Sequence, residues 1–356
     1  MTLYALSPDR AVLGVVTDIK SLQWVVEYQD AGSVKLVCNI SDGNRALLRR
    51  GNLLYNIDDD RLCLIEDYQI DDDKKSATLT VWGALTACRI SQRCVVGTAN
   101  VTNAEAGMLG LVQANLHGLP LIVAAAQGYT EDVTGTAVTD TEVQDGVQTI
   151  AKASGLGYKV TYDFDTATET FCVLRGTDRT QGSDSYVGYF GDDIGNVAKI
   201  KIKAADSGSK NVAIVLGEGE GTNRKVVIVG DATGADRREM VVNAASTKRT
   251  YQVTNADGTY TQATYTEAEY ESVLTGKGLK ALAKNAPELD ISAEVLEGVL
   301  RWRTDYDVGD VMPLKLTRYG ILCEARVAAV KLIYETAGNR KVVAALNNIT
   351  IKGGNL

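Results

Sequence analysis

The chain has 356 residues and a formal net charge of −8, from 37 Lys and Arg against 45 Asp and Glu. Hydrophobic residues make up 45% and charged residues 23%, which is ordinary globular usage and excludes global disorder. The negative charge argues against a surface that grips nucleic-acid phosphates, and the single histidine, His117, removes most histidine-based mechanisms. The 34 glycines, 16 tyrosines and only 4 prolines are typical of many strands joined by tight turns.

The sequence shows no targeting or membrane segment. The N-terminus lacks a basic stretch followed by an apolar run, so we expect no secretory signal. The most apolar stretch, residues 119–126, is far shorter than a membrane span, so we expect no membrane insertion. The six cysteines show no C-x-x-C spacing, and we expect reduced thiols in the core rather than zinc ligands: Cys38, Cys63, Cys88, Cys94, Cys172 and Cys323.

Residues 1–98 predict a first unit of consecutive strands. Short runs rich in Val, Ile, Leu and Tyr alternate with turn signals about every 8–12 residues, which is typical of an antiparallel barrel or sandwich. A single helical turn is expected around residues 45–48, before Gly51. The predicted strands are residues 11–19, 23–28, 33–39, 53–57, 62–70 and 77–82.

Residues 99–182 predict an inserted α/β domain of two helices and a hairpin. Asn103 can cap a first helix that runs to Asn115, and Gly155 follows a second helix at residues 142–154. Two alternating runs at 158–162 and 170–175 predict the hairpin.

The remainder predicts a second β unit, at residues 183–256 and 290–356, interrupted by a helical insert at 257–289. Thr266 and Glu269 have the spacing of a capping box at the start of the helix, whereas Gly276 and Gly278 weaken it midway. The predicted strands are residues 197–203, 212–216, 225–229, 291–300, 311–316, 321–334 and 341–346.

The two strand-rich parts share a pattern. Arg50-Gly51-Asn52 and Val308-Gly309-Asp310 each precede a strand, a long strand, a polar turn and another strand. The pattern predicts two related barrels in one chain. The expected fold class is therefore mainly β, with two tube-like antiparallel β-barrels and two smaller inserted α/β or helical pieces.

Three acidic or glycine-rich motifs have the composition of a ligand site. Residues 58–60 and 71–73 are aspartate triplets that could hold a hard cation, but both fall where a hairpin must turn, and aspartate favours turns. Residues 217–221 (GEGEG) lack the lysine and the helix of a phosphate loop, so we expect a hairpin turn.

No catalytic constellation is visible either. The adjacent pairs at 66–67, 131–132 and 192–193 point to opposite faces of a strand, so adjacency alone makes no catalytic dyad. His117 stands at a helix end, where a cation complements the dipole, and no G-x-S-x-G elbow is present. We therefore predict no catalytic residues, no cofactor site and no metal site, and a protein that is not an enzyme.

Several short motifs together resemble tail hub proteins of bacteriophages. They are Trp24, Gly32, Gly51-Asn52, Ile65-Glu66-Asp67 and residues 79–83, followed by LRGTDRTQG, LGEGEGTNR and DYDVGDVMPLKL further along. The resemblance covers nearly the whole chain, and each motif is short and mostly structural.

The resemblance implies a structural hub of a tail tip or baseplate. In such hubs each subunit carries two tube-like barrels, and three subunits form a ring whose six edges match a sixfold tail tube, while a threefold spike or fibre docks below. The expected partners are two further copies, the tail tube or distal tail protein, and a spike, fibre or tape-measure protein, without specific nucleic-acid binding. The expected location is the virion tail tip, after assembly in the bacterial cytoplasm.

Two other functions remain open from the sequence. Some hub relatives carry peptidase or lysozyme domains, so a tail-associated cell-wall hydrolase is one alternative; the chain ends at Leu356 without such a domain, and we expect no enzymatic role. A peripheral receptor-binding tail protein is the other. Both an infectious phage and a tail-like bacteriocin fit this resemblance.

Overall fold

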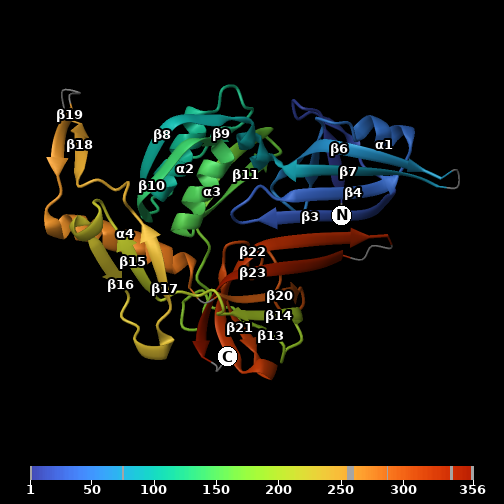
Figure 1. Ribbon diagram of the computed structural model, residues 1–356. Helices are drawn as coiled ribbons and strands as arrows, with labels where there is room; N and C mark the ends of the chain where they lie inside the picture. Colours follow the sequence, from blue (N-terminus) through green and yellow to red (C-terminus); the bar gives the residue numbers. More distant parts are fainter. Residues whose placement is uncertain (1, 74–75, 255–259, 287, 337–339, 354–356) are drawn as a thin grey trace. The chain divides into compact units, whose positions relative to one another are not determined.

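The computed structural model describes residues 2–73, 76–254, 260–286, 288–336 and 340–353, and the fold is mainly β (Figure 1). The chain forms two compact units. The first comprises Met1–Ile200 together with Ser292–Leu356, and the second comprises Lys201–Ile291.

The main sheet of the chain has 13 strands. Its N-terminal half contributes β1 (Leu3–Leu6), β2 (Val12–Val15), β3 (Ile19–Glu27), β4 (Ser33–Asn39), β5 (Leu53–Asn56), β6 (Leu62–Asp72) and β7 (Ala77–Leu85). Its C-terminal half contributes β13 (Phe190–Gly191), β14 (Val197–Ala205), β20 (Glu288–Leu296), β21 (Val311–Leu316), β22 (Ile321–Glu335) and β23 (Arg340–Gly353). The long strands pair antiparallel.

The strand order repeats a four-strand unit. From one side the order is β14-β20-β23-β22 and then β3-β4-β7-β6, so each of these four strands of the C-terminal half has a counterpart in the N-terminal half. The two four-strand groups join where β22 pairs with β3, and Figure 1 shows these two strands side by side. We call this pairing the seam. Along the path that the described strands trace, pairing runs from β14 to β2 without returning to its start.

The predicted repeat is visible in backbone hydrogen bonds at the glycine corners. Gly51 N donates to Ile65 O at 2.8 Å, and Ile65 N donates to Asn52 O at 2.9 Å. In the other half, Gly309 N donates to Val327 O at 2.7 Å, and Val327 N donates to Asp310 O at 2.9 Å. Both glycines have a positive φ, which suits a residue without Cβ.

Burial in the sheet follows the two-residue period of a strand. In β3 the side chains of Leu22, Trp24 and Val26 are fully buried, whereas the residues between them are half-exposed. The helical turn expected after β4 is present as α1 (Asp42–Leu47), where the Ser41 side chain accepts from Asn44 N.

The segment at residues 99–182 contains the two expected helices, α2 (Ala104–Ala114) and α3 (Val143–Ser154). Asn103 caps the first, and Gly155 ends the second in the left-handed conformation. The helices share a buried cluster with three strands of one small sheet and two of another. These strands are β8 (Cys94–Asn103), β9 (Ile122–Val123), β10 (Asp132–Glu142), β11 (Gly157–Asp163) and β12 (Thr168–Leu174).

The second unit packs helix α4 (Glu267–Lys284) on a three-stranded sheet. The capping box predicted at Thr266 and Glu269 is confirmed. The sheet strands are β15 (Val212–Leu216), β16 (Val226–Val229) and β17 (Glu239–Asn243), and β18 (Thr250–Thr254) pairs with β19 (Tyr260–Thr264). Short 3-10 helices are η1 (Thr86–Gln92), η2 (Gly221–Asn223), η3 (Gly234–Asp236) and η4 (Thr317–Tyr319).

The two glycines inside α4 predict opposite effects of alanine substitution. A Cβ at Gly278 would lie 2.6 Å from a methyl of Val229 and 2.9 Å from one of Val215, so Gly278→Ala should cost about 1–3 kcal/mol by overpacking. A Cβ at Gly276 would meet nothing within 4 Å, so Gly276→Ala should stabilise by about 0.5–1 kcal/mol through helix propensity. Thermal unfolding of the two variants tests the pair, and effects of equal sign would contradict it.

Candidate functional site

The seam is held on one face by a buried ionic cluster around Asp59, in the turn between β5 and β6. The Asp59 carboxylate is inaccessible to solvent; it accepts from Trp24 Nε1 at 2.7 Å and from Arg61 Nη1 at 2.9 Å. Arg303 of the C-terminal half reaches the same carboxylate at 3.3 Å and stacks over the Trp302 ring. Asp59 therefore links the two halves of the chain across the seam.

The neighbouring aspartates extend the cluster in two directions. Asp58 accepts from the Tyr334 hydroxyl of β22 at 2.5 Å. Asp60 pairs with Lys159 of the inserted domain at 2.7 Å and with Arg303 at 3.3 Å. The triplet expected to be a plain hairpin turn thus joins three parts of the first unit.

Burial and charge shift the acid strengths of the cluster in opposite directions. Burial raises the pKa of Asp59, and the nearby Arg61 guanidinium, which acts to lower this pKa, does not outweigh the effect of burial. Burial also acts to raise the pKa of Asp60, but the charges of Lys159, Arg61 and Arg303 outweigh it and hold this pKa below its ordinary value.

Asp60→Asn should make the folded chain less sensitive to acid. A carboxyl whose pKa is lowered in the folded state adds stability above its unfolded pKa of about 4, and this is lost as the pH falls toward the folded pKa. Between pH 6 and pH 3 the parent chain should therefore lose more unfolding free energy than the variant. Asp59 is present in both proteins, and Asp67→Asn on the exposed part of β6 is the control. Parallel losses in parent and variant would contradict the prediction.

A second anchor at the seam is Tyr28, which follows β3. Its ring is buried, and its hydroxyl donates toward Leu174 O at 3.1 Å and accepts from Gly176 N at 3.0 Å. Its own backbone N donates to Ala328 O of β22 at 2.9 Å, and its O accepts from Tyr158 N at 3.0 Å. Tyr28 thereby ties the N-terminal half to both the insert and the C-terminal half.

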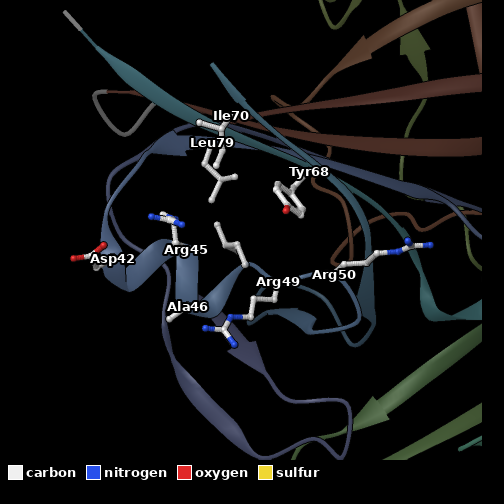
Figure 2. Close-up of a pocket in the computed structure, with 9 residues that line it drawn as sticks. Asp42, Arg45, Ala46, Arg49, Arg50, Tyr68, Ile70 and Leu79 are labelled. Atoms are coloured by element: carbon white, nitrogen blue, oxygen red, sulfur yellow. The ribbon is translucent and has the colours of Figure 1, made fainter. Parts of the chain in front are cut away.

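An open cavity of about 630 Å³ lies between α1 and the outer part of β6. Figure 2 shows Arg45, Arg49 and Arg50 splayed around it, with Tyr68, Ile70 and Leu79 on the strands that face α1. Asp42 is the one carboxylate in the described lining. The cavity combines an apolar centre with a cationic rim, a composition that is common at protein interfaces.

The remaining acidic candidates serve the local structure. Residues 71–73 belong to the β6–β7 hairpin, as expected, and GEGEG connects the antiparallel β15 and β16. Glu131 pairs with Arg175 at 2.5 Å, Asp193 pairs with Lys315 at 2.7 Å, and Asp192 accepts from the backbone of Thr317 and Arg318. In the part of the chain that the structure describes, no group of three or more His, Cys, Asp or Glu is placed to hold a metal.

His117 lies at a helix end as expected, whereas the core position expected for the cysteines holds for four of them, since Cys94 is exposed and Cys172 is partly buried. His117 is exposed just after α2. All six cysteines are free, and four are buried: Cys38, Cys63, Cys88 and Cys323. Burial raises the pKa of Cys38 to about 11 and that of Cys88 to about 12, which makes both thiols poor nucleophiles. None of the described helices is long and apolar enough to cross a membrane.

Fold and site together define a mainly β protein with a duplicated strand unit, held at its seam by buried ionic and aromatic contacts. The chain belongs to the family described as Siphovirus ReqiPepy6 Gp37-like protein, since the sequence model of that family matches residues 2–346. The resemblance to phage proteins drawn from the sequence motifs is thereby confirmed at the level of the family. No curated protein sequence matches the chain.

Solved structures share the fold over almost the whole chain. The tail protein from Neisseria meningitidis MC58 has a TM-score of 0.57 and 12% identity, covering 97% of this chain and 95% of that one. The 43 kDa tail protein of prophage MuSo2 from Shewanella oneidensis has a TM-score of 0.55 and 12% identity, covering 98% of both chains. A chain of the Francisella PdpA-VgrG complex has a TM-score of 0.52 and 7% identity, covering 99% of this chain and 59% of that one.

Proposed function

We propose that the chain is the structural hub of a phage-type tail tip or baseplate, which joins a sixfold tail tube to a threefold spike or fibre. The observation that carries the proposal is the duplicated strand order across the seam. Because one copy supplies two equivalent four-strand units side by side, three copies in a ring supply six. Such a ring meets a sixfold partner on one side and keeps threefold symmetry on the other.

The proposal extends to the domain plan. In the ring, each four-strand unit and its neighbours form a tube-like barrel, with residues 1–98 in the first and residues 183–256 and 290–356 in the second. Residues 99–182 and 257–289 are the inserts. The fold shared with two tail proteins and with a chain of a PdpA-VgrG complex supports a structural place in a tail or a similar assembly.

The chemistry of the chain supports a conduit rather than an enzyme. The carboxylate pairs at 131–132 and 192–193 contain members that form ion pairs or backbone hydrogen bonds with neighbouring residues. The pair at 66–67 lies exposed on β6. A subunit with a net charge of −8 offers no excess of cations to retain DNA, or an acidic tape-measure protein, that passes through the ring. We propose that the protein acts at the virion tail tip after assembly in the host cytoplasm.

The mass of the assembly and its place in the tail test the proposal. The purified chain at micromolar concentration should form a species of three times 38.1 kDa in native mass measurement. Images of assembled tails should place its ring between tube and spike. A chain that stays monomeric alone and forms no ring in tails, or that lies at the periphery of the particle, would overturn the proposal.

A further inference from the structure

The outer part of β6 exposes apolar side chains whose counterparts in the other half are buried. Tyr68 and Ile70 lie three and five residues after the corner residue Ile65, and they are 57% and 43% exposed. Val330 and Leu332 lie three and five residues after the equivalent corner residue, Val327, and both are 0% exposed. The same position in the repeat is therefore covered in one half and open in the other.

The side chains of Val330 and Leu332 are buried where β22 pairs with β3 at the seam. Leu332 pairs with Trp24 and Val330 with Val26, so β3 occupies the side of β22 that would otherwise be a free edge. In the described pairing, β6 has β7 on one side along residues 67–72 and no strand on the other. A free strand edge with apolar side chains is a template for pairing with another chain.

The arginines at the cavity repeat a second element of the seam. Arg303 lies six residues before Gly309 and pairs with Asp59 and Asp60 in the turn of the other half. Arg45 lies six residues before Gly51, at the rim of the cavity beside Tyr68 and Ile70. The outer part of β6 and the nearby Arg45 thus have the same features as the seam, an apolar strand and an arginine. In the described pairing no strand lies against this part of β6 on the side away from β7.

We infer that β6 pairs with β14 of a second copy of this chain, so that the seam within each copy recurs between copies. This inference rests on the proposed ring and names the surfaces that close it. The strand order calls for β14, because β14 stands at the far end of the described path and is the counterpart of β3. With this pairing, the four-strand order repeats from one copy to the next around the ring.

Charge and polarity on the two strands are complementary. Along β6, Asp67 and Asp71 alternate with the apolar Tyr68 and Ile70, so acids face one side and apolar groups the other. Along β14, the exposed Lys199 and Lys201 alternate with apolar residues of the sequence VAKIK. Antiparallel pairing of the two places lysines against aspartates on one face and apolar side chains together on the other.

Two acids, Asp192 and Asp193 in the segment after β13, lie beside the turn that would cover the arginines. The counterpart of the β5–β6 turn is the β21–β22 turn, whose backbone amides at Thr317 and Arg318 are held by Asp192 at 2.7 and 3.0 Å. The neighbouring Asp193 is exposed and pairs with Lys315 at 2.7 Å, so Arg45 would join this pair as a second cation. These carboxylates take the place toward Arg45 that Asp59 and Asp60 take toward Arg303.

The register of the proposed pairing follows from the seam. Leu332 lies opposite Trp24, and the counterpart of Leu332 is Ile70. Leu296 N donates to Asn196 O at 2.9 Å and Lys199 pairs with Glu294 at 2.9 Å, which aligns β14 with β20 so that Ile200 is the counterpart of Trp24. Ile70 of one copy therefore lies opposite Ile200 of the next.

Disulfide trapping tests this register. In a background of Cys94→Ser, which removes the exposed thiol, the variant Ile70→Cys/Ile200→Cys should form cross-linked dimers and trimers on mild oxidation, in the purified chain and in assembled tails. Each single variant is the matched control and should form none of the trimer. Native mass measurement of the same samples reports whether a ring is present.

A ring without cross-links in the double variant would overturn the inference and leave the proposed hub intact, whereas the absence of any ring would overturn both. Arg45→Glu supplies an independent measurement, because it places a carboxylate against Asp192 and Asp193. It should weaken trimer formation about tenfold or more, while Lys152→Glu, an exposed cation on α3, should not. Equal trimer stability in the two variants would show that another partner covers the cavity.

Discussion

Gly309→Ala should lower the free energy of unfolding by about 3 kcal/mol or more. A Cβ at this position would lie 2.2 Å from a ring carbon of Tyr28, and the glycine has a φ of +95°, which L side chains rarely adopt. The Tyr28 ring cannot retreat easily, since its hydroxyl is fixed by the backbone of Leu174 and Gly176. The loss combines backbone strain with overpacking at the seam.

Gly51→Ala is the matched control, because Gly51 occupies the same corner in the other half. It has a φ of +88°, but a Cβ there would meet nothing within 4 Å. The substitution should therefore cost only the backbone strain, about 1–2 kcal/mol. Urea unfolding of both variants gives the comparison, and equal losses would show that Tyr28 does not constrain the corner at Gly309.

Asp59→Ala should destabilise the chain by about 3–5 kcal/mol. The substitution leaves the Arg61 guanidinium, whose side chain is 5% exposed, without its buried partner, and it leaves Trp24 Nε1 without an acceptor. It also removes one of the contacts through which Arg303 holds the C-terminal half. The cost arises mainly from the unpaired buried charge rather than from the lost attraction.

Asp58→Ala provides the comparison within the same turn. Asp58 is exposed and accepts one hydrogen bond, from Tyr334, so its loss should cost about 1 kcal/mol. The two variants are compared by urea unfolding at neutral pH. If Asp58→Ala were as damaging as Asp59→Ala, the turn conformation and not the buried ion pairs would govern the seam.

Local signals in the sequence predicted the helices and the corners well. Asn103, Gly155 and the Thr266–Glu269 pair are caps whose chemistry acts within a few residues, and all three are in place. The repeat around Gly51 and Gly309 was visible for the same reason, because a positive φ and a strand on either side leave a short pattern. Gly276 and Gly278 did not break α4, since Gly278 allows the helix to approach the sheet closely.

Several strands left too weak a pattern to be predicted. β8 and β10 are rich in threonine, asparagine and glycine, so their buried valines do not form an apolar run. The strand expected at residues 291–300 ends earlier, at Leu296, and Leu300 and Trp302 are buried from the turn that follows. In each case packing against distant elements decides the structure, and the local sequence does not contain that information.

The candidate site shows the same division. Three consecutive aspartates predict only a hairpin turn, whereas Asp59 is buried because Arg61 and Trp24 surround it, and Trp24 comes from a strand that lies apart in the sequence. The contribution of Arg303 comes from a segment more than 240 positions away. A signal that could have indicated the cluster is the pairing of an arginine with each glycine corner, at Arg45 and Arg303, six residues upstream.

The seam also determines when the main sheet can be completed during synthesis, because β3 and β22 must both have left the ribosome before they can pair. Lys331 and Gln23, which meet across it, are separated by 308 positions, so β3 emerges long before its partner is translated. At about 5–20 residues per second, the nascent chain waits on the order of tens of seconds with that flank of β3 unsatisfied. Synthesis in the cell therefore favours a chaperone or rapid completion at this stage, and truncated products that lack β22 should aggregate.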